Sequence, residues 1–128
     1  MKICVSASSN SLDANVDSRF GRCPYFVIID SETMEFDLVP NDSTNAAHGA
    51  GIQAAQTVVN KGVKVVITGN VGPNAFQVLS TTGIKVLTGV SGTIKEAVEK
   101  YKNGKLQETA NPTVGGHFGM GKGSGRGQ

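Results

Sequence analysis

The chain lacks the features that mark several common classes of protein. Its longest apolar run, residues 26–29, has the length of a strand and falls far short of the roughly 20 residues of a membrane-spanning helix. Its first residues lack the long apolar stretch and small-residue cleavage site of a signal peptide. Its two cysteines form no CxxC pair, which excludes the common zinc and redox motifs. We therefore expect a cytoplasmic protein with reduced thiols and no membrane partner.

Acidic residues are missing from the end of the chain, where none follows Glu108. Residues 1–111 hold ten basic and ten acidic side chains, so Lys122 and Arg126 supply the whole net charge of +2. A neutral body argues against the phosphate-neutralising surface of a DNA-binding protein, and we expect no nucleic-acid partner. Seven of the 17 glycines also lie beyond this body. The composition predicts a globular domain over residues 1–111 and a flexible, glycine-rich basic tail over residues 112–128.

The pattern of apolar and polar residues predicts eight elements in this single domain. Strands are predicted over 3–7, 25–30, 34–39, 63–68 and 84–87, and helices over 50–61, 73–82 and 94–101, the last with a capping box formed by Thr93 and Glu96. The second and third strands are joined so tightly that they should form an antiparallel hairpin, whereas the later strands alternate with helices and should be parallel. We therefore predict an α/β fold with three helices and a mixed five-stranded sheet in the order 3-2-1-4-5. Only the second strand is reversed, which is the arrangement of ribonuclease-H-like folds.

This topology brings distant loops to one edge of the sheet, outside the carboxyl ends of the parallel strands, where α/β proteins bind ligands. The segments that meet there are residues 8–17, 41–49, 69–73 and 88–92, together with residues 19–24 at the start of the reversed strand. Cys23 is therefore expected at this edge, with Arg19 and Arg22 beside it. His48 lies in the second of these loops and is expected close to them.

The same register separates the two cysteines. Cys4 begins the first strand, and Cys23 is expected beyond the far end of that strand, roughly 15 Å away at about 3.3 Å per residue. A disulfide needs Cα atoms within about 7 Å, so we predict that Cys4 and Cys23 form no disulfide. Cys4 alternates with core positions and is predicted to be an inert core thiol.

Three short motifs stand at this predicted edge. They read SRFGRCPYF at 18–26, HGAGIQAA at 48–55 and GPNAF at 72–76. In order and spacing they resemble the dinitrogenase iron–molybdenum cofactor biosynthesis family, over residues 1–108. The resemblance implies non-catalytic binding and delivery of an anionic metal–sulfur cluster, of the iron–molybdenum or a related molybdenum–sulfur type, between donor and acceptor proteins of cluster assembly. The residues expected to bind the cluster are Arg19, Arg22, Cys23, His48, Gly49, Gly51, Gly72 and Asn74.

Cys23 and His48 are the candidate metal ligands. Thiolate is the soft ligand that iron–sulfur sites prefer, and Arg19 and Arg22 are expected to lower the pKa of the Cys23 thiol. An imidazole at a helix start can ligate a metal or donate to an anion. In the alternative interpretation, Cys23 is an ordinary small residue before Pro24 and His48 is a solvated loop side chain.

The two arginines and the glycine-bearing turns offer groups that bind anions. The guanidiniums either clamp an anionic cluster or form surface salt bridges with Asp17 or Asp13. The turns at Gly49, Gly51 and Gly72 allow main-chain amides at a helix start to approach an anion, although a plain strand-to-helix turn needs such residues as well. In the tail, His117 and Met120 either fold over a metal site or belong to a disordered segment.

Three other functions are weighed against a non-enzymatic carrier. A ribonuclease-H-like nuclease needs carboxylates over its central strands to hold two divalent metals, and the first strand offers Cys4, Ser6 and Ser8 instead. A thiol enzyme would use Cys23 as nucleophile and His48 as base. A regulatory or interaction domain would bind only protein and no metal.

Overall fold

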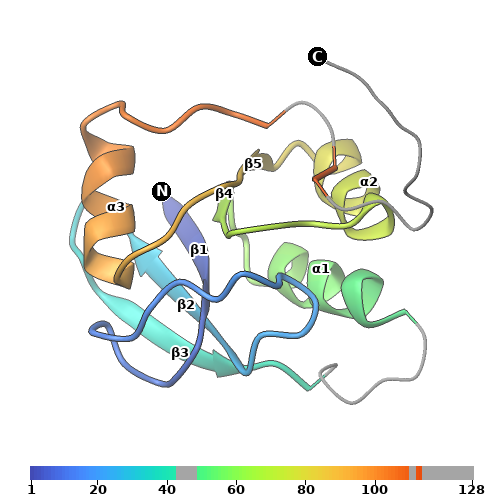
Figure 1. The fold of residues 1–128 in the computed structure, drawn as a ribbon, viewed down its shortest axis with the longest axis horizontal. Helices are drawn as coiled ribbons and strands as arrows, with labels where there is room; N and C mark the ends of the chain where they lie inside the picture. The colour runs from blue at the N-terminus through green and yellow to red at the C-terminus, as the bar shows by residue number, and fades with distance from the viewer. Residues whose placement is uncertain (43–48, 110–111, 114–128) are drawn as a thin grey trace.

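Within residues 1–42, 49–109 and 112–113, which the computed structural model describes, five strands form one mixed sheet in the order β3-β2-β1-β4-β5 (Figure 1). The strands are β1 (Lys2–Ala7), β2 (Tyr25–Asp30), β3 (Phe36–Pro40), β4 (Val65–Ile67) and β5 (Lys85–Leu87). β2 runs antiparallel to β1 and β3, whereas β1, β4 and β5 are parallel. The predicted strand order and the reversed second strand are confirmed. The likeness to ribonuclease-H-like folds stays a prediction.

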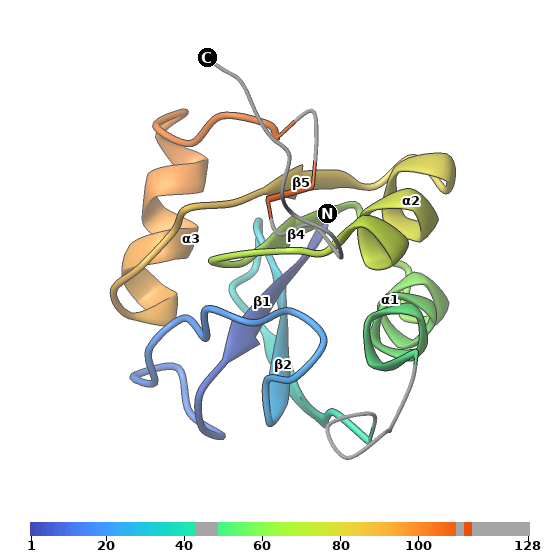
Figure 2. The ribbon, with the colours of Figure 1, turned by 45° about the vertical axis from the view of Figure 1, so that its right-hand side comes forward.

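Helices cover both faces of this sheet. The helices α1 (Ala50–Asn60) and α2 (Pro73–Thr81) lie on one face and α3 (Ile94–Lys102) lies on the other (Figure 2). α1 buries Ala54, Ala55 and Val58 completely, because apolar residues three and four apart share one side of a helix. The three predicted helices are confirmed. None of the helices in the described part of the chain has the length and apolar character needed to cross a bilayer.

The predicted capping box at the start of α3 is also confirmed. The hydroxyl of Thr93 accepts a hydrogen bond from the amide of Glu96 at 3.1 Å, and the Glu96 carboxylate accepts one from the amide of Thr93 at 2.8 Å. Two amides that the first helical turn would otherwise leave without a partner are thereby satisfied by the side chains of this helix.

The apolar side of β3 is exposed. Alternation such as that of residues 34–39 is typical of a strand with one buried side. Met34 instead lies in the turn before the strand, with φ 64°, and Phe36 and Leu38 are 43% and 38% exposed. β3 is an edge strand, and α3 packs on residues of β2, β1, β4 and β5. The strand is therefore confirmed, but it begins two residues later than predicted and its apolar side faces solvent.

The segment after α3 returns across the sheet toward α2 (Figure 1). Thr109 forms a 2.6 Å hydroxyl–hydroxyl hydrogen bond with Thr88 beyond the end of β5. Thr113 donates its amide to the carbonyl of Val71 at 2.9 Å, and its hydroxyl accepts from the Val71 amide at 2.9 Å. The start of the predicted tail is thus bonded to the loop before α2, and residues 114–128 lie outside the described residues.

Candidate anion-binding site

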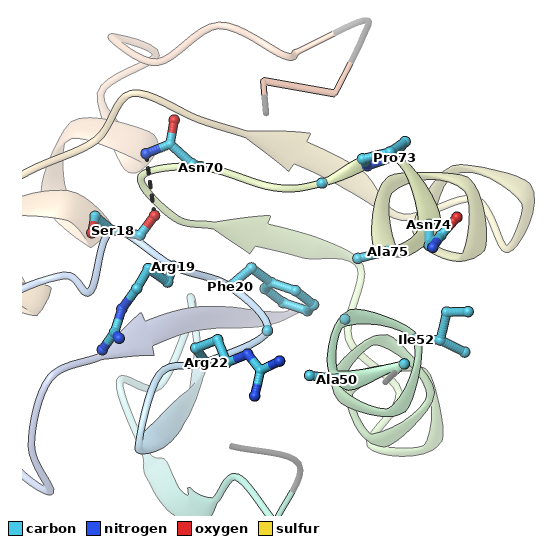
Figure 3. Close-up of a pocket in the computed structure, with 14 residues that line it drawn as sticks. Ser18, Arg19, Phe20, Arg22, Ala50, Ile52, Asn70, Pro73, Asn74 and Ala75 are labelled. Carbon is cyan, nitrogen blue, oxygen red and sulfur yellow. Dashed lines mark hydrogen bonds between the residues drawn. The ribbon is translucent and has the colours of Figure 1, made fainter. Parts of the chain in front are cut away.

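A pocket of about 380 Å³ opens between the segment that precedes β2 and the first turns of α1 and α2 (Figure 3). Small-molecule sites typically occupy roughly 300–1,000 Å³, so the pocket suits a small ligand. Its lining comes from residues 18–22, called the arginine loop below, from residues 49–52, and from residues 70 and 72–75. Three of the segments that the topology predicted at one sheet edge therefore meet around this pocket.

Small residues let these segments touch through their backbones. A Cβ at Gly21 would lie 3.0 Å from the Cα of Gly51, and a Cβ at Gly51 would lie 3.3 Å from the Cβ of Ala75. Glycine permits such close approach because it has no Cβ. Gly21, Gly51 and Ala75 thus form a row that joins the arginine loop to α1 and α1 to α2.

Main-chain bonds hold the arginine loop against the loop that precedes α2. Arg19 and Asn70 form a parallel β-bridge, and the amide of Phe20 donates to the carbonyl of Asn70 at 3.2 Å. The side-chain amide of Asn70 donates to the carbonyl of Ser18 at 3.3 Å (Figure 3). A Cβ at Gly69 would lie only 2.7 Å from the Cα of Ser18, so the two loops can lie this close only because residue 69 is glycine.

Phe20 and Cys23 anchor this segment in the core. Phe20 is 1% exposed, and its ring centroid lies 5.3 Å from that of Phe26 in a tilted arrangement. Cys23 is fully buried, and its thiol donates to the carbonyl of Phe20 at 3.3 Å. Because these two side chains point inward, the two arginines that flank Gly21 are presented on the surface.

The two arginines extend in different directions. The buried carboxylate of Asp17 accepts hydrogen bonds from the amide of Arg19 at 2.8 Å and from its Nε at 3.2 Å. These bonds raise the pKa of the Arg19 guanidinium. Arg22 extends instead toward the beginning of α1 near Ala50 (Figure 3). The alternative weighed for the arginines, a salt bridge with Asp17, is therefore present for Arg19.

The first turns of α1 and α2 line the pocket and carry glycine caps. Their N-cap residues, Gly49 and Gly72, have no side chain that could accept a bond from the first amides, and neither first turn contains an acid. Gly49 has φ 74°, a conformation that favours glycine. α3, by contrast, is closed by its own Thr93. At α1 and α2, the first amides can therefore donate hydrogen bonds to an anion in the pocket, and the positive ends of the helix dipoles can attract it.

The charged side chains of the pocket all have one sign. Its lining includes two arginines and no aspartate, glutamate, cysteine or histidine among the residues that the structure describes. The same part of the chain holds no group of three or more such residues that could bind a metal ion. The arrangement can hold an anion by charge and hydrogen bonds, without a side-chain ligand to metal from the described lining.

Six of the eight residues expected to bind a cluster line this pocket: Arg19, Arg22, Gly49, Gly51, Gly72 and Asn74. Cys23 does not line it. His48 lies outside the described residues, directly before Gly49, and His117 and Met120 of the tail lie outside them as well.

The Cys23 thiol lies in the core. Burial, with a smaller contribution from the Asp17 carboxylate, raises its pKa to about 12. The prediction that Arg19 and Arg22 lower this pKa is wrong, because the thiol is buried and loss of hydration penalises the thiolate. A buried, protonated thiol is a poor metal ligand. Cys23 therefore lies in the core and outside the pocket lining, and its role as a metal ligand stays a prediction.

Cys4 and Cys23 are both free, so the prediction that they form no disulfide is confirmed. Cys4 is fully buried in the same core cluster as Cys23. Burial, followed by the nearby Cys23, raises its pKa well above that of an ordinary thiol. Its predicted role as an inert core thiol agrees with this position.

Several contributors to the site were not predicted. Asp17 was expected only as a surface partner for an arginine, yet it is buried and holds the backbone of the arginine loop as well as a side chain. Phe20 and Asn70 were named only as members of the motif at 18–26 and of the loop at 69–73, with no role of their own. The run Asp17-Ser18-Arg19 has no periodicity that would place it on a strand or helix. The glycines at positions 21 and 69 were the available signal that two backbones approach closely there.

Comparison with known proteins identifies the chain's relatives. Residues 1–104 match the family model described as dinitrogenase iron–molybdenum cofactor. An uncharacterized protein of Methanocaldococcus jannaschii is 32% identical over 111 residues, which cover 84% of this chain and 91% of that protein.

Two solved structures share both fold and sequence with the chain. The apo form of the orange protein from Desulfovibrio gigas is 42% identical, with a TM-score of 0.86, over 88% of this chain and 95% of that one. A candidate NifB protein from Thermotoga is 36% identical, with a TM-score of 0.74, over 84% of this chain and 91% of that one. These alignments cover most of each chain, so the similarity concerns the whole domain.

Proposed function

Because this chain belongs to the dinitrogenase iron–molybdenum cofactor family, we propose that it binds and carries an anionic metal–sulfur cluster in the pocket described above. One observation carries the proposal: two arginines and two glycine-capped helix starts line a single pocket that has no acid among its described residues. The cluster is cargo in this proposal, taken up and delivered without a catalysed reaction.

Charge and hydrogen bonds hold the cargo in this scheme. Sulfide and oxo groups of a cluster accept hydrogen bonds as phosphate oxygens do, and helix N-termini are ready-made sites for such groups. Each helix dipole contributes about 0.3–1 kcal/mol toward a nearby anion, and up to about 2 kcal/mol where the site is partly buried. Arg22 adds a permanent positive charge beside the start of α1. Several modest contributions of the same sign therefore add up to binding.

The donor set favours a cluster that brings its own sulfides. The described lining supplies no thiolate, imidazole or carboxylate to complete the coordination of a bare metal ion. One chain cannot complete a four-cysteine iron–sulfur site, because it has two cysteines. An iron–molybdenum or molybdenum–sulfur cluster, whose metals are already bound by sulfide, fits this chemistry. His48 directly precedes Gly49 of the pocket lining and is proposed as a further contact from the loop before α1.

Two relatives support this proposal. The orange protein was solved in an apo form, which implies that it also exists with something bound. The Thermotoga relative bears the name of NifB, and the family carries the name of the iron–molybdenum cofactor. We accordingly propose donor and acceptor proteins of cluster assembly as the partners of this chain, in the cytoplasm.

The proposal is tested by anaerobic reconstitution. The full chain is mixed with tetrathiomolybdate and copper(I) in one series and with iron, sulfide and molybdate in another, then desalted. Bound metals per chain and the visible spectrum are measured. We expect stoichiometric metal with charge-transfer bands in at least one series. Colourless, metal-free protein in both series would overturn the proposal.

A matched pair of variants shows whether the pocket is responsible. Arg22→Gln removes a positive charge from the lining, and Lys64→Gln removes an exposed one before β4, outside the lining. Hydrogen bonds to charged groups are worth about 1.5–3 kcal/mol, so Arg22→Gln should weaken binding by roughly ten- to a hundredfold. Lys64→Gln should bind like the parent chain. Equal losses in the two variants would locate the cluster elsewhere.

A further inference from the structure

Exposed apolar side chains gather at one edge of the sheet. Among the described residues, the large hydrophobic side chains that are exposed are Met1 (43%), Met34 (39%), Phe36 (43%) and Leu38 (38%). Phe36 and Leu38 belong to β3, Met34 lies in the turn before it, and the carbonyl of Met1 accepts a bond from Ser31 of that turn at 2.9 Å. Single hydrophobic residues are normal on a surface, but a concentration of this kind marks an interaction site.

The outer side of β3 presents main-chain groups ready to pair with another strand. The carbonyl of Glu35 accepts a bond from β2 at 2.8 Å, and the amide of Asn41 donates to the residue before β2 at 3.0 Å. Because bonding direction alternates along an antiparallel strand, the N–H and C=O groups of Phe36 and Leu38 point away from β2. No strand in the described ranges pairs with that side of β3.

One face of this edge is apolar. Leu38 lies opposite Val27 in the β2–β3 register, and Val27 belongs to the core cluster that contains the buried side chains of α3. Phe36 and Leu38 therefore extend from the α3 face of the sheet, beyond the area that α3 covers.

The other face of the same edge is acidic. Asp37, Glu35 and Asp30 line one surface hollow, whose other lining residues are Lys2, Ile28 and Phe36. The amino group of Met1 pairs with Asp30 at 3.7 Å, and the Lys2 ammonium donates to a carbonyl at the end of α1 at 3.3 Å. In the described part of the chain no cation lies within ion-pair distance of Asp37 or Glu35. Two carboxylates thus face outward from the strand.

We propose that β3 accepts an extended segment of a partner protein as a sixth strand of the sheet. This segment places apolar side chains on the face of Phe36 and Leu38, and Lys or Arg side chains on the face of Asp37 and Glu35. Main-chain bonds to Phe36 and Leu38 provide affinity, and the alternating side chains provide specificity. The proposal stands on the β3 edge alone and is independent of what the pocket binds.

A second copy of this chain is a poorer occupant of the edge. In one antiparallel register, Phe36 of each copy would pair with Leu38 of the other copy. The two Asp37 side chains would then lie directly opposite one another, and like charges in that position are destabilising. If Leu38 lay opposite its own copy, Phe36 would lie opposite Pro40, which has no N–H to donate. Charge complementarity therefore favours a basic segment of a different protein.

The test uses the metal-free full chain and two blocked peptides, (Lys-Val)₃ and (Glu-Val)₃. Amide hydrogen exchange at Phe36 and Leu38 is followed by NMR as each peptide is added. We expect (Lys-Val)₃ to slow exchange at both amides, by about tenfold once about nine-tenths of the protein is bound, and (Glu-Val)₃ to leave it unchanged. Equal protection by both peptides, or protection by neither, would overturn the proposal.

A charge-reversal variant distinguishes specific from non-specific peptide binding. Asp37→Lys should lose the response to (Lys-Val)₃ and gain one to (Glu-Val)₃, while Glu108→Lys, an equal change at an exposed position outside the sheet, should keep the original preference. An unchanged preference in Asp37→Lys would refute the assigned partner chemistry. Protection of Phe36 and Leu38 before any peptide is added would also overturn it. Removal of residues 114–128 and sedimentation would then distinguish the chain's own tail from a second copy.

Discussion

Gly21 and Gly51 meet backbone to backbone: a Cβ added to Gly21 would come within 3.0 Å of the Cα of Gly51. This contact sets the spacing between the arginine loop and the first turn of α1. It therefore also sets the position of Arg22 relative to the amides that begin that helix.

Gly21→Ala is expected to weaken cluster binding by separating these two segments. The extra methyl group meets main-chain atoms, which cannot turn aside, so overpacking should also cost about 1–3 kcal/mol of unfolding free energy. Gly104→Ala is the control, because a Cβ at this position would meet no neighbouring atom. The φ of 71° disfavours alanine, so this variant should lose about 1–2 kcal/mol of unfolding free energy without a change in the pocket. Urea unfolding and metal titration measure both effects. Parent-like affinity in Gly21→Ala would show that this spacing does not matter for binding.

Gly72→Asp is expected to stabilise α2 and abolish its contribution to anion binding. Gly72 has φ −81°, which aspartate adopts readily. A carboxylate at the N-cap can accept hydrogen bonds from the first amides of α2, which receive no side-chain cap from glycine. The gain should be a few tenths to about 1 kcal/mol. Gly72→Asn supplies a cap without the charge and should lose less affinity. If the two variants bind metal equally well, charge at this helix start does not govern binding.

Cys23→Ala is expected to keep its full complement of bound metal after reconstitution. Its thiol is buried among core side chains and donates a hydrogen bond to the carbonyl of Phe20. Its removal should therefore lower the unfolding free energy and leave the pocket lining in place. Metal content is measured at a temperature where the variant is folded, as judged by circular dichroism. Loss of metal from a folded Cys23→Ala protein would restore the thiol as a ligand.

The unfolding free energy is expected to fall as pH rises above about 8.5. An ordinary thiol has a pKa of about 8.5, whereas burial raises the pKa of Cys23 to about 12. Between these values the unfolded chain has released a proton that the folded chain retains, so stability decreases by up to about 1.4 kcal/mol per pH unit for this group. Below about pH 8.5 the thiol is protonated in both the folded and the unfolded chain, so the unfolding free energy has its full value there with respect to this group.

Cys23→Ala supplies the comparison, because it should show a shallower fall than the parent chain when urea unfolding is measured at pH 8 and pH 10 with a reductant present. Cys4, whose pKa is raised in the same direction, should supply part of the remaining slope. Identical slopes in the two proteins would mean that the folded state does not keep Cys23 protonated.

Cluster affinity is expected to decrease as ionic strength rises. An anion held by guanidiniums and helix ends is screened by salt over a Debye length of about 10 Å at 0.1 M and about 3 Å at 1 M. A cluster held by covalent metal ligation would change much less. Retention on a desalting column equilibrated at 0.05, 0.2 and 1 M salt distinguishes the two, and the salt effect should be smaller in Arg22→Gln. Salt-independent retention would contradict electrostatic binding.

The strand order could be predicted because it follows from local patterns and a few chirality rules. Closely joined strands form a hairpin, and strands that alternate with helices become parallel. The positions of Arg19, Arg22, Gly49 and Gly72 around one pocket followed from that topology, since the carboxyl ends of parallel strands share an edge.

The orientation of individual side chains could not be predicted in the same way. Residues 18–24 form an irregular segment, so no period of two or 3.6 assigns Cys23 inward and Arg22 outward. Their orientations depend on Phe20 packing against Phe26, which is a tertiary contact. The direction of the Cys23 pKa shift follows from burial, and burial is known only once the fold is known. For the same reason, the alternation around Phe36 identified a strand without showing that its apolar side would lie at an uncovered edge.

The glycine caps of α1 and α2 have a thermodynamic consequence. Each leaves the first turn of its helix without the side-chain acceptor that Thr93 gives to α3, and an anion bound in the pocket would supply the acceptor that those turns lack. A ligand that binds only the folded chain adds RT ln(1 + [L]/Kd) to its stability, about 2.7 kcal/mol at a hundredfold excess over Kd. If the proposed cluster binds there, the empty chain is the more easily unfolded and proteolysed form, and binding of the cluster protects the chain.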